Sequence, residues 1–346
     1  MTYGPQRVSR RRVLTTLAAA PLAVGLAWPA AAQDAKPIPV RIGLQAQTSW
    51  LLYTARDLKL FEKVGLDPQY VRLTTGAQSI AAMASRSLDI ASPGVTPFAA
   101  GLAQGVNWKV VGIDTTLPNA EGFVARKDTD IRRLEDLKGK TIAVARGSTS
   151  YYGLLAALQS KGIGKNDVKL LLMGPPEQIG AMSNGNVDAV AVWEPWIQRQ
   201  IKETGARLIG MEADYGVHTA LAVYAVHGEF AEKNKEAVDR FLRALLLAYQ
   251  HIEKNGPEVA IAAVADAMGV TKELARTMYE EAPAPKVPRW TDATYQYSVV
   301  PGSPFPTEAQ RMASFLADEK IIDKKVDLST AFDDSFIRRV LGGAGK

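Results

Sequence analysis

Short apolar segments alternate along most of this chain with stretches in which apolar residues recur every three or four positions. The first pattern predicts β-strands and the second predicts amphipathic helices. The predicted strands cover residues 40–45, 69–73, 88–91, 108–114, 122–125, 141–145, 168–173, 187–193, 207–209 and 220–226. Most of them are apolar at nearly every position, which is typical of strands in a parallel sheet that is covered on both faces.

Helices are predicted between these strands and, in a longer run, after the last one. Their ranges are 51–63, 76–86, 97–104, 131–137, 150–160, 176–183, 195–203, 235–254, 257–267, 272–280 and 307–318. Residues 282–306 interrupt the pattern with six prolines and form either an ordered wrapping loop or a flexible one. The aromatic residues of this segment favour packing over disorder.

The alternation falls into two similar units, which predicts an α/β protein with two doubly wound lobes. Short crossings near residues 115–121 and 211–219 would connect them. We therefore expect residues 33–117 and 217–346 to form lobe I and residues 118–216 to form lobe II. Because open α/β sheets bind ligands at the carboxyl ends of their strands, two facing lobes predict a ligand cleft that closes like a clamshell.

The first 32 residues have the pattern of an export signal. They contain four arginines and no acidic residue, and an apolar stretch over 14–28 precedes Ala30-Ala31-Ala32. The small residues predict cleavage before Gln33, and the arginine pair resembles a bacterial twin-arginine leader. The alternative, an uncleaved membrane anchor, is disfavoured because the stretch contains prolines and is too short to span a bilayer. We expect the mature protein in the periplasm.

The composition excludes several function classes. The chain of 346 residues has no cysteine, so disulfides, thiolate metal sites and a cysteine nucleophile are ruled out. The formal net charge of +5 comes almost entirely from the arginines of the leader. The remaining residues are nearly balanced, and they give no electrostatic reason to expect a nucleic-acid partner.

A glycine followed by hydroxyl residues marks the start of one predicted helix. Gly147 precedes Ser148, Thr149 and Ser150. Free backbone N–H groups, hydroxyl donors and the positive end of the helix dipole could together bind an anion here. The alternative is plain N-capping, for which serine and threonine are preferred in any case.

Another strand-end motif is Trp193-Glu194-Pro195, which either packs and starts a helix or brings an aromatic wall and a carboxylate to a cleft. No catalytic arrangement accompanies these motifs. The three histidines stand at no metal-ligand spacing, and G-x-S-x-G, Walker A and G-x-G-x-x-G motifs are absent. We expect a protein that is not an enzyme and that uses no cofactor.

Several motifs together resemble the periplasmic substrate-binding proteins of ABC transporters, in particular the nitrate/sulfonate/taurine group that is related to thiamine-pyrimidine-precursor binding proteins. They are DLKGKTIAV over 136–144 with Gly147-Ser148, Gly76 with the segment 81–91, NGNVDA over 184–189, and Trp193-Glu194-Pro195. Ser87 stands where the group usually has glycine. The resemblance covers residues 38–255.

The resemblance implies a type II periplasmic-binding-protein fold, a small ligand between the lobes and an inner-membrane ABC permease as the partner of a monomeric receptor. Carried over residue by residue, it places the ligand at Gln47, Trp50, Gly76, Pro93, Gly94, Ser148, Thr149, Tyr151, Trp193 and Glu194.

Several ligand classes remain open. An organic anion, a sulfonate or a taurine-like molecule, is favoured over nitrate because Trp50, Tyr151, Tyr152 and Trp193 offer more aromatic surface than a four-atom ion requires. A pyrimidine, a thiamine precursor or an aromatic acid is the alternative. Enzymes of the same fold, such as porphobilinogen deaminase or pyrimidine synthases, are disfavoured by the missing cysteine and by the export signal.

Overall fold

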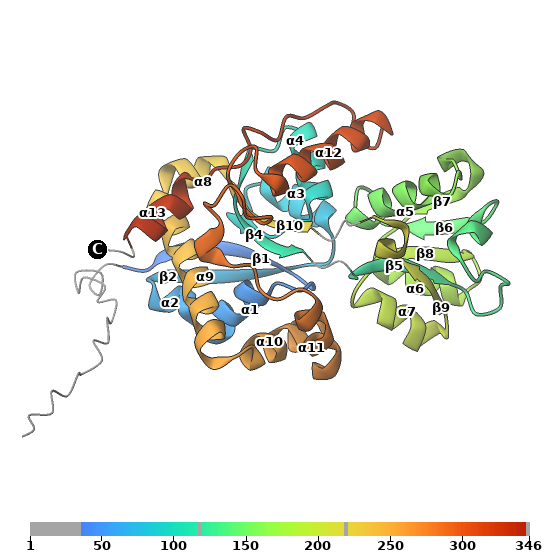
Figure 1. Ribbon diagram of the computed structural model, residues 1–346, viewed down its shortest axis with the longest axis horizontal. Coiled ribbons are helices and arrows are strands. Elements are labelled where there is room, and N and C mark those ends of the chain that lie inside the picture. The colour runs from blue at the N-terminus through green and yellow to red at the C-terminus, as the bar shows by residue number, and fades with distance from the viewer. Residues whose placement is uncertain (1–35, 117–118, 218–220, 344–346) are drawn as a thin grey trace, which may run out of the picture. The chain divides into compact units, whose positions relative to one another are not determined.

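The computed structural model describes residues 36–116, 119–217 and 221–343 and contains two five-stranded sheets (Figure 1). Lobe I is the sheet β2 (Leu66–Leu73), β1 (Ile38–Gln45), β3 (Ile90–Ala91), β10 (Leu221–His227) and β4 (Trp108–Thr116), in this spatial order, with the helices packed on it. Lobe II is the sheet β7 (Lys169–Leu172), β6 (Thr141–Val144), β8 (Ala189–Trp193), β5 (Glu121–Ala125) and β9 (Arg207–Met211) with its helices. All ten predicted strands are confirmed, whereas the predicted leader lies outside the described residues.

Both sheets are mixed, so the expectation of purely parallel sheets was wrong. β10 runs antiparallel to β3 and β4, and β5 runs antiparallel to β8 and β9. The reason is the crossing that precedes each of these two strands. The chain leaves one sheet at the carboxyl ends of its parallel strands and enters the other sheet at the same kind of edge, so the entering strand points the opposite way.

Helices cover both sheets, and most agree with the sequence pattern. Lobe I carries α1 (Trp50–Asp57), α2 (Leu60–Lys63), α3 (Gly76–Ala84), α4 (Val95–Ala103), α8 (Gly228–Lys233), α9 (Lys235–Asn255), α10 (Glu258–Met268), α11 (Lys272–Glu281), α12 (Pro304–Asp318) and α13 (Ser335–Gly343). Lobe II carries α5 (Thr149–Ser160), α6 (Pro175–Ser183) and α7 (Trp196–Thr204). Short 3-10 turns lie at Leu134–Leu137, Lys165–Asp167, Glu212–Tyr215 and Val287–Arg289.

Three differences from the predicted helices have local causes. The helix expected over 51–63 is two helices, because Lys59 adopts a left-handed conformation with φ 52°. The helix expected over 131–137 is only the 3-10 turn at its end. The short helices α8 and α13 were not predicted, since six to nine residues give little periodic signal.

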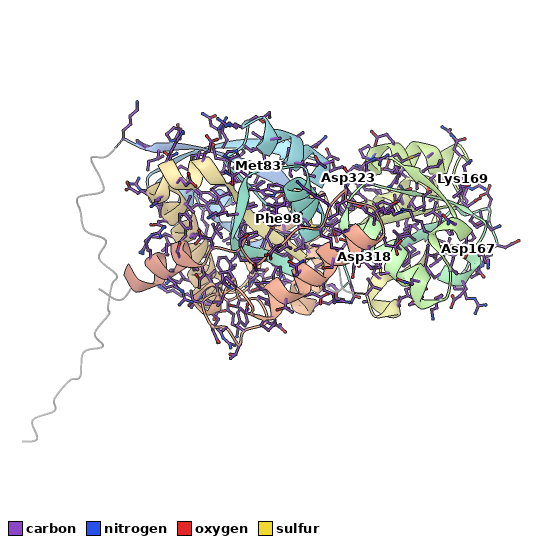
Figure 2. The ribbon with its side chains drawn as sticks, turned by 90° about the horizontal axis from the view of Figure 1, so that it is seen from above. Met83, Phe98, Asp167, Lys169, Asp318 and Asp323 are labelled. Atoms are coloured by element: carbon purple, nitrogen blue, oxygen red, sulfur yellow. The ribbon has the colours of Figure 1, made fainter. Side chains whose placement is uncertain are left out.

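The proline-rich segment 282–306 is ordered and packs on lobe I, which confirms that its aromatic residues favour packing. Trp290 is 0% exposed and lies against Gly112 of β4, where a Cβ would come within 2.6 Å of the indole ring. The Tyr295 hydroxyl accepts a hydrogen bond from the backbone N–H of Lys286 at 3.0 Å. Elsewhere in the same lobe, Met83 and Phe98 fill the core between sheet and helices (Figure 2).

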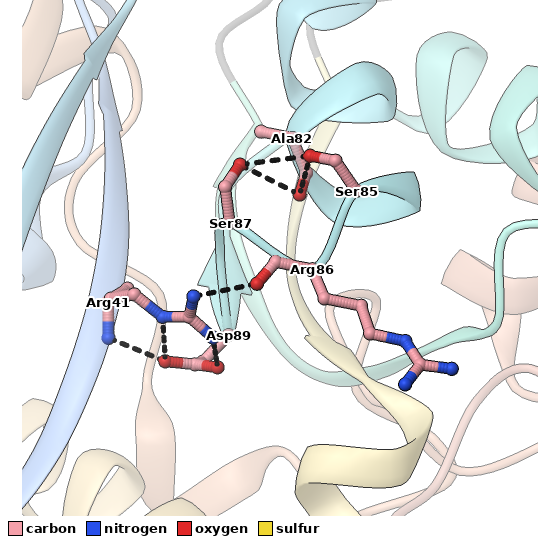
Figure 3. Close-up of polar contacts among 6 residues, drawn as sticks. All are labelled: Arg41, Ala82, Ser85, Arg86, Ser87 and Asp89. Carbon is pink, nitrogen blue, oxygen red and sulfur yellow. Dashed lines mark hydrogen bonds and ion pairs between the residues drawn. The ribbon is translucent and has the colours of Figure 1, made fainter.

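An arginine–carboxylate pair joins the first and third strands of lobe I (Figure 3). Arg41 donates to Asp89 from Nε at 2.9 Å, from Nη2 at 2.6 Å and from its backbone N–H at 2.8 Å. Its Nη1 donates to the carbonyl of Arg86, a residue with φ 57°. The positive φ falls on Arg86 and not on Ser87, so a serine fits at the position where the related group usually has glycine. The Ser87 hydroxyl donates to the Ala82 carbonyl.

We expect Asp89→Ala to lower the free energy of unfolding by about 2–3 kcal/mol, because it leaves a guanidinium and a backbone N–H without their acceptor. The lower part of the usual range applies since the Arg41 side chain is 39% exposed. Urea unfolding measures the change. Asp57→Ala, which breaks an exposed ion pair with Arg56, is the control and should cost less than about 1 kcal/mol. Equal losses in the two variants would contradict this account.

Candidate functional site

A cavity of about 60 Å³ lies between the two lobes, at the edges of the sheets where their parallel strands end. Lobe I lines it with Gln45, Gln47, Thr48, Gly76, Gly94, Pro97, Thr115, Leu221, Ala222 and Met268. Lobe II lines it with Ala120, Glu121, Ser148, Thr149, Trp193 and Glu194. The cavity is several times larger than the space that one water molecule needs, so it can hold a small ligand.

Seven of the ten residues that the sequence singled out line this cavity. They are Gln47, Gly76, Gly94, Ser148, Thr149, Trp193 and Glu194. The other three do not. Trp50 is 0% exposed and donates its indole N–H to the Ala282 carbonyl. The Pro93 carbonyl accepts from the backbone N–H of Val223.

Tyr151 is the third residue that the structure does not bring to the cavity. Its ring faces the ammonium of Lys165, and the neighbouring Tyr152 packs edge-on against Phe315 of α12. Of the four aromatic side chains expected at the ligand, Trp193 alone lines the cavity among the described residues. The aromatic argument against nitrate therefore does not hold.

The first turns of three helices meet at the cavity. Thr75 caps α3, because its hydroxyl accepts a hydrogen bond from the backbone N–H of Gln78. Gly94 is the N-cap of α4, one residue before Val95, so this helix begins two residues before the predicted range of 97–104. Ser148 caps α5.

These helix ends are in close contact with one another. A Cβ on Gly76 would collide with Pro97, and a Cβ on Gly94 would lie 2.9 Å from the methyl group of Thr149 in the opposite lobe. The N–H groups of a helix's first turn have no partner inside the helix, and the dipole makes this end positive. Three such ends at one cavity favour a bound anion.

The hydroxyl groups at the start of α5 are already used within the protein, contrary to the expectation that they would donate to a ligand. Ser148 Oγ donates to the carbonyl of Ala145 at 2.9 Å. Thr149 Oγ1 donates to one carboxylate oxygen of Glu121, and Ser150 Oγ donates to the other at 2.6 Å. The backbone N–H groups of Ser148, Tyr151 and Tyr152 also donate within the protein, so those of Thr149 and Ser150 are the donors that remain at this turn among the described residues.

Glu121, Leu221 and Ala222 line the cavity, and the sequence analysis missed all three. Ligand-binding residues were expected at the carboxyl ends of strands, but only the parallel strands of each sheet have their carboxyl ends at the ligand edge. Glu121 begins β5 and Leu221 begins β10, and each of these strands is the antiparallel one of its sheet. Their amino ends therefore lie at the ligand edge. The signal that could have found them is their position directly after the predicted crossings.

Trp193 and Glu194 supply one polar donor and one polar acceptor at the end of β8. The indole N–H of Trp193 is buried and has no hydrogen-bond partner among the described residues. Glu194 is 7% exposed, and its carboxylate accepts from the side chain of Gln198 at 3.1 Å and from its backbone N–H at 3.3 Å. Burial raises the pKa of Glu194, and the hydrogen bonds from Gln198 oppose this shift.

A buried network below the cavity fixes the orientation of Gln47. Its Nε2 donates to the Ser92 hydroxyl and to Asp114 Oδ2, both at 2.8 Å. Asp114 is 0% exposed and also accepts from the Ser49 hydroxyl at 2.5 Å, and burial raises its pKa. Because the amide NH₂ is used in this network, Gln47 offers its carbonyl oxygen to the cavity. The side-chain oxygen of Gln45, which also lines the cavity, has no partner in the described part of the chain.

The described ranges contain neither a membrane-spanning helix nor a metal site. No helix there is long and apolar enough to cross a membrane. No group of His, Cys, Asp and Glu side chains in those ranges could hold a metal ion.

Comparison with known proteins identifies the family. The model of the family described as NMT1/THI5 like matches residues 47–260. The chain belongs to the NMT1/THI5-like family. A relative named as an aliphatic sulfonates-binding protein of Bacillus subtilis (strain 168) is 27% identical over 309 residues, which are 87% of this chain and 88% of the relative.

The chain is also similar to a further relative in sequence and to a solved structure in fold. The taurine-binding periplasmic protein of Escherichia coli (strain K12) is 31% identical over 228 residues, covering 65% of this chain and 70% of that protein. The solved structure of the alkanesulfonate-binding protein SsuA from Xanthomonas axonopodis pv. citri, bound to MOPS, superimposes with a TM-score of 0.71. It is 23% identical and covers 86% of this chain and 98% of that chain. The predicted two-lobed type II periplasmic-binding-protein fold of this NMT1/THI5-like chain is thereby confirmed.

Proposed function

We propose that this protein is an extracytoplasmic receptor that binds a small organic sulfonate between its lobes and delivers it to an ABC importer. The observation that carries the proposal is the meeting of the first turns of α3, α4 and α5 at one cavity. Beside them lies the indole N–H of Trp193, which has no hydrogen-bond partner in the part of the chain that the structure describes. A sulfonate has three oxygens that accept hydrogen bonds, and such donors match them without a full counter-charge. Relatives named for sulfonate and taurine binding support it.

Several further features belong to the same proposal. Residues 1–32 are a leader that is cleaved near Gln33, and the mature protein works in the periplasm as a monomer without catalytic activity. Residues 33–117 and 217–346 form one lobe and residues 118–216 the other, and the ligand closes them about the two crossings. The crossings include residues 117–118 and 218–220, which lie outside the described ranges.

Calorimetric titration and thermal shift of residues 33–346 test the ligand class. The set comprises propanesulfonate, taurine, nitrate, butyrate and a pyrimidine. We expect saturable binding of a sulfonate, with about 2.7 kcal/mol of added stability at one hundred times its dissociation constant. Binding of nitrate or the pyrimidine in preference to both sulfonates would contradict the proposal.

Within the sulfonates, the cavity favours one that also carries an amine. Hydrogen-bond acceptors that line the cavity include the side-chain oxygens of Gln45 and Gln47 and the carboxylate of Glu194. An ammonium group of a taurine-like ligand would donate to such oxygens, whereas an alkyl chain would leave the Gln45 oxygen without a partner among the described residues and the Glu194 carboxylate with Gln198 alone.

The pH dependence of binding separates the two ligand types. Taurine affinity should fall as the pH falls through the raised pKa of Glu194, because protonation removes the charge that attracts the ammonium. Propanesulfonate affinity should rise over the same window, because protonation removes a repulsive charge. Glu194→Gln should abolish both trends and weaken taurine about ten- to hundredfold.

A second carboxylate, that of Glu121, also lines the cavity. The contribution of Glu194 to the pH dependence is therefore obtained by comparing wild type with Glu194→Gln over the same pH series. Identical taurine profiles in the two proteins would exclude Glu194 as the partner of the amine.

A further inference from the structure

A second and larger cavity, of about 430 Å³, lies beside the first and is lined by both lobes. The two cavities share the same loops. Thr75 lines the second cavity and Gly76 the first, while Arg146 lines the second and Ser148 the first. The lining residues of the two cavities are neighbours in the chain at both loops, so a group attached to a ligand in the first cavity points to the second as its nearest further space.

Arg146 gives the second cavity a positive charge that is paired with no described residue. It is exposed, and no described residue forms a hydrogen bond or an ion pair with it. No Lys, Arg or His is found among the described residues that line the first cavity. Arg146 lies two residues before Ser148 in the sequence, and it is therefore the positively charged residue closest along the chain to the turn that begins α5.

Besides the hydroxyl groups of Thr74 and Thr75, the second cavity is lined by the side-chain amide of Gln78 and the carboxylate of Glu177. Gln78 accepts the backbone N–H of Thr74 with its side-chain oxygen at 2.6 Å, which leaves its NH₂ group as a donor. Glu177 stands in the first turn of α6, and its carboxylate lies within 2.7 Å of the position of a Cβ on Gly174. It bends back over its own helix end, where the dipole favours a negative charge.

We propose that the second cavity is an outer subsite for a carboxylate at the distal end of the sulfonate ligand, and that Arg146 binds this group. A guanidinium matches the two oxygens of a carboxylate with paired N–H donors. The ligand class is an amino sulfonate that carries a carboxylate, such as cysteate or homocysteate. The inference rests on the proposed function, since the sulfonate must occupy the first cavity.

Pairs of ligands that differ only by the carboxylate test the subsite. Taurine against cysteate and homotaurine against homocysteate are titrated calorimetrically into residues 33–346 at fixed low salt. We expect at least one carboxylated ligand to bind about tenfold more tightly than its partner. Arg146→Ala should remove this gain and leave taurine affinity within about twofold.

Three further variants sharpen the test. Arg146→Lys should keep part of the gain, because it retains the charge but not the paired donors. Glu177→Gln should change affinity in the opposite direction and tighten the carboxylated ligands, because it removes the competing carboxylate. Lys169→Ala removes a positive charge from the exposed surface of lobe II, outside the cavity lining, and should leave the gain intact (Figure 2).

The outcomes distinguish the two proposals. If no sulfonate binds, the proposed function fails. If taurine binds but the carboxylate adds no affinity, or if Arg146→Ala weakens taurine and cysteate equally, the outer subsite is wrong and the receptor function stands.

Discussion

Replacing Trp290 by alanine is expected to lower the free energy of unfolding by about 3–5 kcal/mol, the usual cost of removing a buried tryptophan. Its side chain is 0% exposed and lies against the backbone of Gly112 and the ring of Tyr224, at a centroid distance of 6.3 Å. The cavity left behind cannot collapse easily, because β4 is held by its neighbours in the sheet. Urea unfolding followed by circular dichroism measures the loss.

Two controls accompany this prediction. Tyr297→Ala removes a half-buried aromatic side chain from the same segment and should cost much less. Gly112→Ala should also destabilise, since its new methyl group would meet the Trp290 ring from the other side. A loss below about 1 kcal/mol for Trp290→Ala would show that the segment 282–306 does not contribute to the core as its burial indicates.

Replacing Gly94 by valine should weaken ligand binding about ten- to hundredfold, because the lobes can no longer approach closely. Gly94 has φ −60°, which any residue adopts, so the backbone itself is not strained. The conflict is with the Thr149 methyl group in the opposite lobe, 2.9 Å from the added Cβ. Calorimetry with the sulfonate that binds wild type measures the effect, and stability without ligand should change little.

A second substitution makes this prediction specific. Thr149→Ser removes the methyl group but keeps the hydroxyl that donates to Glu121, so it should restore part of the affinity lost in Gly94→Val. Gly180→Val is the matched control, since no atom lies within 4 Å of its Cβ position outside its own helix. If Gly94→Val binds as wild type does, close approach of the lobes at this point is not required for binding.

The sequence by itself determined the elements and most of the loops that line the cavity. Strands that are apolar at nearly every position could be recognised without tertiary information, because they are buried on both faces. The helix starts at Thr75 and Ser148 were equally local, since an N-cap hydroxyl bonds to the backbone three residues ahead. Motifs such as Trp193-Glu194-Pro195 pointed to the correct edge of lobe II.

Only the tertiary structure decided which side chains at that edge face the cavity and what each can offer. The direction of β5 and β10 depends on where the chain crosses between the lobes, and this direction brings Glu121 and Leu221 to the site. Trp50 and Tyr151 stand in the expected loops, but packing against distant segments turns them away from the cavity. A pattern of apolar and polar positions records whether a residue is buried. It does not record which partner buries it, because partners such as Ala282 are brought close by the fold and not by the sequence.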